Sequence, residues 1–162
     1  MMYDQATCTL TIPPHWNGRL VNLPLGIKNL IFTEDIGNNI CSKFNDSIEN
    51  LPNTITTIKL GYSFNGFVDF LPSSLQILTL GYSFNQPVDN LPQKLTHLTF
   101  GDWFNKPIDN LPNSITHLTL GKYYSKEVSN LPYNLQILRI PYTFKKLKKV
   151  PFGCEVFFYI KN

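Results

Sequence analysis

The sequence predicts a repeat solenoid that is mainly β, with a parallel sheet on its concave side and little or no α-helix. The dipeptide Leu-Pro recurs with an unbroken period of 20 residues, at positions 51–52, 71–72, 91–92, 111–112 and 131–132. Under each copy lies the same order of apolar, aromatic and glycine positions. A fixed period of this length is typical of a chain in which each unit stacks on the next and shares its core.

Composition agrees with one solenoid domain covering residues 1–162. Charged residues make up only 15% of the chain, against about 25% in typical domains. The chain holds 12 phenylalanines, 8 tyrosines and 12 prolines. These counts indicate a core held by aromatic packing, with turns fixed by proline.

The N-terminal units are edited copies of the repeat. Residues 1–22 form a degenerate first unit or cap, and regular units run over residues 23–150. One of these units carries an insertion at residues 33–43, which predicts a loop on one rim. Insertions in repeat proteins often bind partners, although simple drift explains this one equally well. Residues 151–162 repeat the opening half of a unit and form a C-terminal half-repeat or cap, giving about seven strands in all.

Each unit contains one short strand followed by a turn. In the segment LxxLxL, as at Leu95, Leu98 and Phe100, inward apolar residues alternate with outward ones, which is strand periodicity. A glycine follows each strand, and a sharp turn with positive φ is expected there. These glycines are Gly61, Gly81, Gly101 and Gly121. A unit of 20 residues leaves no room for a helix, so the convex return is expected to be short and irregular.

An aromatic residue recurs in the second half of every unit and predicts a stacked spine on the convex side. Its members are Trp16, Phe44, Phe64, Phe84, Phe104, Tyr124 and Phe144. An asparagine follows four of these aromatics, at Asn45, Asn65, Asn85 and Asn105. Asparagine in such a column is expected to bond the backbone of the neighbouring coil.

The units LTLGYSFNQPVDNLP and LTFGDWFNKPIDNLP resemble the FNIP, or FGxxFN, class of leucine-rich repeat. This class is abundant in social amoebae and in giant viruses that infect protists. The resemblance implies a right-handed, leucine-rich-repeat-like superhelix, a Phe spine and a role in protein–protein contacts. The pattern weakens where Tyr124-Ser125 and Phe144-Lys145 replace Phe-Asn.

The outward positions of the sheet are the candidate partner-binding residues. The concave face is expected to present Thr57, Lys59, Ile77, Thr79, His97, Thr99, His117, Thr119, Ile137 and Arg139. The rim after each glycine adds Tyr62, Tyr82, Asp102, Lys122 and Tyr142. A mixed face with exposed Ile and Tyr and little charge is typical of interface centres. The alternative is that Thr and Ile are present there as good strand formers.

The sequence therefore predicts a non-enzymatic scaffold that binds a partner protein through the concave sheet and adjacent rim. The alternative is a self-associating module, a homodimer formed through terminal coils. The apolar run of residues 156–160 and its exposed strand edge favour that alternative.

Other chemistries are disfavoured by spacing. His97 and His117 have no third ligand in their column, so no metal site is expected. The carboxylates of Glu49, Asp69, Asp89 and Asp109 are spread along the solenoid, whereas a calcium site needs oxygens that converge on one point. Capping of turn amides is therefore the favoured interpretation. The lysines at 145, 146, 148 and 149 lack a basic groove with aromatics, so no nucleic acid is expected.

No cofactor, catalytic group or membrane association is expected. No cysteine has a histidine near it in the expected stack, and no phosphate loop is present. No run approaches the length of a membrane span, and the three cysteines are too scattered for a disulfide framework. We therefore expect an intracellular, cytoplasmic location, in the host cytoplasm if the source is a virus.

Overall fold

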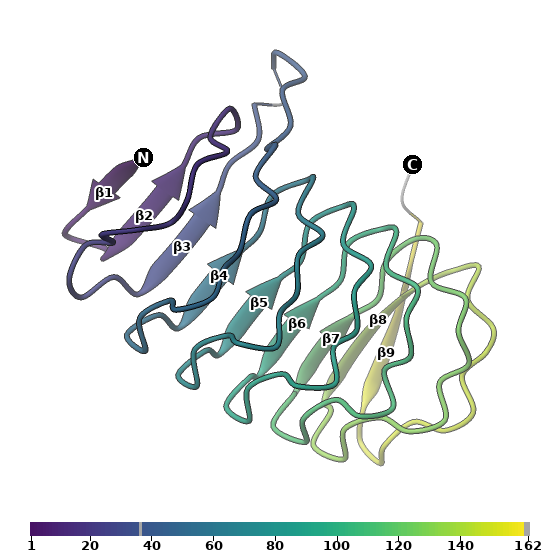
Figure 1. The fold of residues 1–162 in the computed structure, drawn as a ribbon. Coiled ribbons are helices and arrows are strands. Elements are labelled where there is room, and N and C mark those ends of the chain that lie inside the picture. The colour runs from purple at the N-terminus through teal and green to yellow at the C-terminus, as the bar shows by residue number, and fades with distance from the viewer. Residues whose placement is uncertain (36, 161–162) are drawn as a thin grey trace.

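The computed structural model describes residues 1–35 and 37–160, and shows a β-solenoid with one nine-stranded sheet (Figure 1). The strands pair in chain order from β1 to β9. They are β1 (Met2–Asp4), β2 (Thr9–Ile12), β3 (Asn29–Phe32), β4 (Thr57–Lys59), β5 (Ile77–Thr79), β6 (His97–Thr99), β7 (His117–Thr119), β8 (Ile137–Pro141) and β9 (Glu155–Tyr159). Among the described residues there is no helix, and the predicted fold class is confirmed.

The sheet stacks each repeat position on its own copy. Strands β2 to β9 are parallel, and Leu78 pairs in register with Leu98, which pairs with Leu118. Strand β1 differs because it runs antiparallel to β2. It lies outside the repeat. The degenerate units at both ends also form strands, β2 and β9, so the described strands number nine and not about seven.

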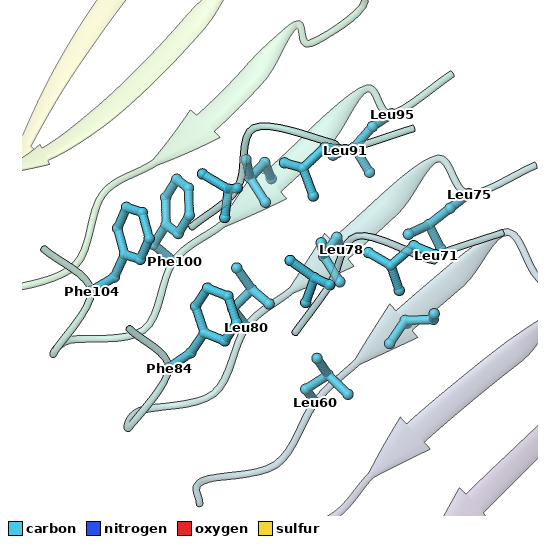
Figure 2. Packing of buried hydrophobic residues seen from close by; sticks show 14 of the residues in the cluster. Leu60, Leu71, Leu75, Leu78, Leu80, Phe84, Leu91, Leu95, Phe100 and Phe104 are labelled. Atoms are coloured by element: carbon cyan, nitrogen blue, oxygen red, sulfur yellow. The ribbon is translucent and has the colours of Figure 1, made fainter. Parts of the chain in front are cut away.

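The core lies between the sheet and the return segments. Figure 2 shows Leu71, Leu75, Leu78, Leu80 and Phe84 of one coil in a row, and beside them Leu91, Leu95, Phe100 and Phe104 of the next coil. All five side chains are buried. The alternation within a strand sends every second side chain inward, and the leucine of each Leu-Pro closes the row from the other side.

The aromatic column packs ring against ring along the solenoid. The ring centroids of Phe64 and Phe84 lie 6.3 Å apart with parallel planes, and those of Phe84 and Phe104 lie 6.0 Å apart. The series continues to Phe44 at one end and to Tyr124 and Phe144 at the other. Trp16 is partly buried against the same core and donates its indole N–H to the carbonyl of Gly18.

The asparagine column satisfies the backbone of the coil that follows. The Oδ1 atom of Asn65 accepts a hydrogen bond of 2.8 Å from the amide of Asn85, whose own Oδ1 accepts one of 3.0 Å from Asn105. Asn105 does the same for the amide of Ser125. One side chain per coil therefore pairs a backbone group that would otherwise be unsatisfied.

The glycine column is needed for close approach rather than for unusual dihedrals. The prediction of positive φ at these glycines is wrong, because in the described chain only Gly26 and Gly153 among the glycines have it. Instead, a Cβ placed on Gly101 would overlap the carbonyl oxygen of Gly81, and one on Gly121 would overlap that of Gly101. Stacked backbones come so close here that no side chain fits.

The insertion at 33–43 forms a small hairpin, in which Asp35 and Ile40 exchange backbone hydrogen bonds of 2.8 Å; Ile36 lies outside the described residues. Glu34 lies at the start of this insertion. Its carboxylate accepts from the amides of Ser42 and Tyr62, the latter at 2.7 Å. The side chain thus links the insertion to the turn of the following coil.

Candidate protein-binding surface

The outward side chains of β4 to β8 form two straight rows, here called the sheet face. Register places Thr57, Ile77, His97, His117 and Ile137 in the first row. The second row holds Lys59, Thr79, Thr99, Thr119 and Arg139. All ten predicted residues therefore share one surface, which is partly or fully exposed along its length.

The centre of the sheet face is a stacked pair of histidines. The rings of His97 and His117 lie 4.1 Å apart, and each Nδ1 is 2.9 Å from the hydroxyl of the preceding threonine, Thr96 or Thr116. Burial lowers the pKa of His117, and the neighbouring His97 and Arg139 lower it further. The pair presents two flat rings between Ile77, which is exposed, and Ile137, which is half-buried.

Charge is confined to the two ends of the second row. Lys59 is exposed in β4, and the guanidinium of Arg139 in β8 lies 5.5 Å from the ring centroid of Phe157. The described residues contain no group of three His, Cys, Asp or Glu side chains able to hold a metal ion. Contact through shape and apolar area, with flanking cations, is the chemistry this face offers.

Aromatic side chains line the turns that follow strands β4 to β8. We call this set the aromatic rim: Tyr62, Tyr82, Trp103, Tyr123 and Tyr142. Ring centroids lie 4.5 Å apart for Tyr62 and Tyr82, 6.4 Å for Tyr82 and Trp103, and 5.4 Å for Trp103 and Tyr123. Trp103 and Tyr123 were missed by the sequence reasoning because they sit one position beyond the aromatic of the earlier units.

Asp102, predicted as a rim residue, points differently. It is only 5% exposed, and its Oδ1 accepts from the amide of Lys122 at 3.4 Å. The hydrogen bond ties this carboxylate to the turn of the next coil, and burial leaves little of its surface for contact with a partner. The aromatic ring that its coil contributes to the rim comes from Trp103 instead.

A cavity of about 370 Å³ lies at the C-terminal end of the aromatic rim. Its lining residues are Lys122, Tyr123, Pro141, Tyr142, Thr143, Tyr159 and Ile160. The hydroxyl of Tyr159 donates a 2.5 Å hydrogen bond to the carbonyl of Leu120, and burial raises the pKa of Tyr159 to about 12. The ammonium of Lys122 lies 5.7 Å from the ring centroid of Tyr123.

The acidic column makes hydrogen bonds along the solenoid. The carboxylates of Asp69 and Asp89 each accept at 2.9 Å from the side-chain amide of an asparagine in the next coil, Asn90 and Asn110. Asp109 accepts from backbone amides at 129 and 130, which is the turn capping expected from the sequence.

The C-terminal lysines are partly engaged. Lys148 lies 2.5 Å from the carboxylate of Glu127, and that contact, with help from Ser129, lowers the pKa of Glu127. Both partners are exposed, so the pair adds little stability. Across residues 1–35 and 37–160, no helix has the length and apolar character needed to cross a membrane.

Comparison with known proteins agrees with this geometry. The crystal structure described as CroV588, a novel circular LRR protein, from a giant virus, shares 35% identity over 84% of this chain with a TM-score of 0.71. The chain spans about a fifth of that protein, 21% of its length. No curated protein matches the chain. The FNIP Repeat family model matches residues 44–83, 67–103 and 104–143, more than half of the chain. The chain therefore belongs to the FNIP repeat family of leucine-rich-repeat-like solenoids.

Proposed function

We propose that the chain is a non-enzymatic scaffold that binds a partner protein through the sheet face and the neighbouring aromatic rim. Repeats of this family typically serve as protein-interaction modules. The observation that carries the proposal is the register of β4 to β8, which gathers residues from five units into one continuous surface. Such a surface spans five coils without a break, and its centre is poor in charge.

The side chains of the sheet face have features of a binding surface, beyond what good strand formers alone would give. Ile77 is exposed on it and pairs in register with His97, whose ring stacks on that of His117, so the apolar and aromatic area is contiguous there. The histidine stack beside it is rigid, since each ring is held by its own threonine. A rigid side chain loses little entropy on binding, which favours affinity.

The test is a fourfold variant with alternating charge: Ile77→Lys, His97→Glu, His117→Lys and Ile137→Glu. Alternation avoids the repulsion that like charges suffer directly opposite one another in a sheet. We expect capture of a specific partner from cell lysate, identified by mass spectrometry, to be lost. The circular dichroism spectrum should stay unchanged because all four side chains point away from the core.

A matched control changes exposed apolar residues elsewhere. Phe67→Lys with Phe70→Glu alters two side chains that are more exposed than Ile77 but lie in the return segment. This variant should capture the partner as the unchanged protein does. If the fourfold variant still captures it, the sheet face is not the binding surface.

A second candidate is self-association through the last coil. Phe158 occupies an inward register position opposite Ile140, yet it is 61% exposed, and Ile160 beside it is more so. A second copy that covered these side chains would remove apolar surface from water. Light scattering across protein concentration tests this, and a mass that stays at 18.6 kDa removes the candidate.

We also propose an intracellular location, in the host cytoplasm if the protein is viral. Cys8, Cys41 and Cys154 are all free thiols. Free, partly exposed thiols fit a reducing compartment better than an oxidising one. Imaging of the tagged protein in infected or transfected cells checks the location, and signal confined to the secretory pathway would contradict it.

A further inference from the structure

We propose that the aromatic rim and the cavity at its end bind a proline-rich peptide in the polyproline II conformation, with an acidic residue beside its prolines. The inference rests on the proposed function, because it gives the chemistry of a partner and the place where it docks. Its site is separate from the sheet face and lies along the edge next to it.

The aromatic rim is a continuous apolar track. Four of its five rings are well exposed: Tyr62 at 37%, Trp103 at 55%, Tyr123 at 49% and Tyr142 at 68%. Successive centroid distances never exceed 6.4 Å from Tyr62 to Tyr123, and Tyr123 and Tyr142 then line one cavity. Isolated exposed rings are common on proteins, but contiguous ones mark binding surfaces.

The spacing of the rim matches the repeat of a polyproline II helix. Neighbouring coils lie about 4.8 Å apart, so every second coil comes at about 9.6 Å. A polyproline II helix rises about 3.1 Å per residue with three residues per turn, and so repeats at about 9.3 Å. Proline rings on one side of such a helix can therefore meet Tyr62, Trp103 and Tyr142, which belong to alternate coils. An extended β-strand repeats at about 6.6 Å and loses this match.

The charges at the rim select the peptide further. Lys122 lines the cavity, and its ammonium lies over the ring of Tyr123. A carboxylate on the peptide would meet it there, while the prolines lie on the apolar rings. A nucleic acid strand suits the rim less, because Lys122 is the only basic side chain among the lining residues of the cavity.

The cavity fits one end of the peptide. Its volume of about 370 Å³ falls within the range of ligand pockets, about 300–1,000 Å³. Pro141, Tyr142 and Tyr159 give it apolar walls, and Tyr159 is fixed by its hydrogen bond to the carbonyl of Leu120. Aromatic-lined grooves of this kind recognise polyproline II peptides because the ligand is ordered before it binds.

The experiment measures the binding of labelled peptides by fluorescence anisotropy. The probe is nine prolines followed by two glutamates, made also in the reverse order, and the control replaces the prolines by Gly-Ser repeats. We expect the proline probe to bind and the Gly-Ser probe to bind at least about ten-fold more weakly. Trp103→Ala and Tyr142→Ala should each weaken binding about ten-fold or more, as aromatic anchors do.

A matched substitution and a charge reversal make the test specific. Tyr133→Ala removes a ring that is 70% exposed but lies outside the rim, and it should leave binding unchanged. Lys122→Glu should lose the acidic probe and gain one that ends in two lysines. Circular dichroism of each variant confirms the fold. Equal binding of the Gly-Ser probe, or no effect of Trp103→Ala, would overturn the proposal.

Other ligand classes are outcomes of the same assay. If labelled oligothymidine or a cello-oligosaccharide binds through Trp103 and Tyr123 while the proline probe does not, the rim serves another class of ligand and the inference is wrong. The proposed function fails separately. Should the sheet-face variant lose its partner while the proline probe never binds, the scaffold role stands and only the peptide class falls.

Discussion

The central coils, residues 57–121, and the C-terminal coils, residues 122–160, differ in how regularly the same residue recurs at each position of the repeat. In the centre, Phe84 stacks between two other phenylalanines, and Asn85 lies between two other asparagines. Towards the C-terminus the columns change, to Lys145 at the asparagine position and to Pro141 at the glycine position. A central side chain therefore serves two interfaces at once, whereas a terminal one serves fewer and tolerates other residues. Sequence regularity is strongest where each residue must fit both neighbours.

The largest expected effect is on the aromatic spine. Phe84→Ala should lower the free energy of unfolding by about 3–5 kcal/mol, because a fully buried ring with a neighbour on each side leaves a cavity. Phe144→Ala should cost less, on the order of 2 kcal/mol, because its ring is tilted against Tyr124 at the end of the column. Urea denaturation of both variants measures the difference. Equal losses would mean that position along the solenoid does not matter.

The next effect concerns the glycine column. Gly101→Ala should destabilise by about 2–3 kcal/mol, because the new Cβ overlaps the carbonyl of Gly81 and neither backbone can retreat without shifting a coil. At the same position of the last full coil, Pro141→Ala should change stability by no more than about 1 kcal/mol, since a Cβ is already accommodated there. Thermal unfolding of the pair checks the contrast, and a harmless Gly101→Ala would refute the close-approach explanation.

Much of this architecture follows from the sequence because identical residues meet. The 20-residue period alone sets the register that joins Leu78 to Leu98, and it places His97 beside His117. It also predicts the backbone bonds of the asparagine column, since an amide side chain in a regular stack has a copy of its own backbone within reach. Features that repeat are visible to an analysis of one sequence.

Features that occur once are invisible to the same reasoning. Glu34 bonds the amide of Tyr62 across 28 residues, and Tyr159 bonds the carbonyl of Leu120 across 39, with no repeat to announce either. Strand β1 also lies outside the pattern. The glycine column was found, but its cause was misjudged, because a period cannot tell a left-handed turn from a close approach between backbones. Trp103 and Tyr123 escaped notice because they shift the rim aromatic by one position.

The smallest expected effects compare two tyrosines under one substitution. Tyr124 is buried in the spine and its hydroxyl has no hydrogen-bond partner among the described residues. Tyr124→Phe should therefore stabilise the fold by about 1 kcal/mol, because an unsatisfied buried hydroxyl is removed. Tyr159→Phe should destabilise it by about 1 kcal/mol, because the bond to Leu120 is lost. The midpoints of denaturant unfolding, at an unchanged dependence of stability on denaturant concentration, give the sign of each stability change.

Alkaline pH sharpens the same comparison. Burial raises the pKa of Tyr159 to about 12 and that of Tyr124 further, whereas tyrosines in the unfolded chain ionise near 10. Between these values the unfolded state binds fewer protons than the folded one, so stability must fall as pH rises from about 10 to 12. Tyr124→Phe should flatten this fall, because one strongly shifted group is gone. Stability curves at about pH 9, 10 and 11 measure the slope. Equal slopes in the two proteins would show that Tyr124 ionises normally within the spine.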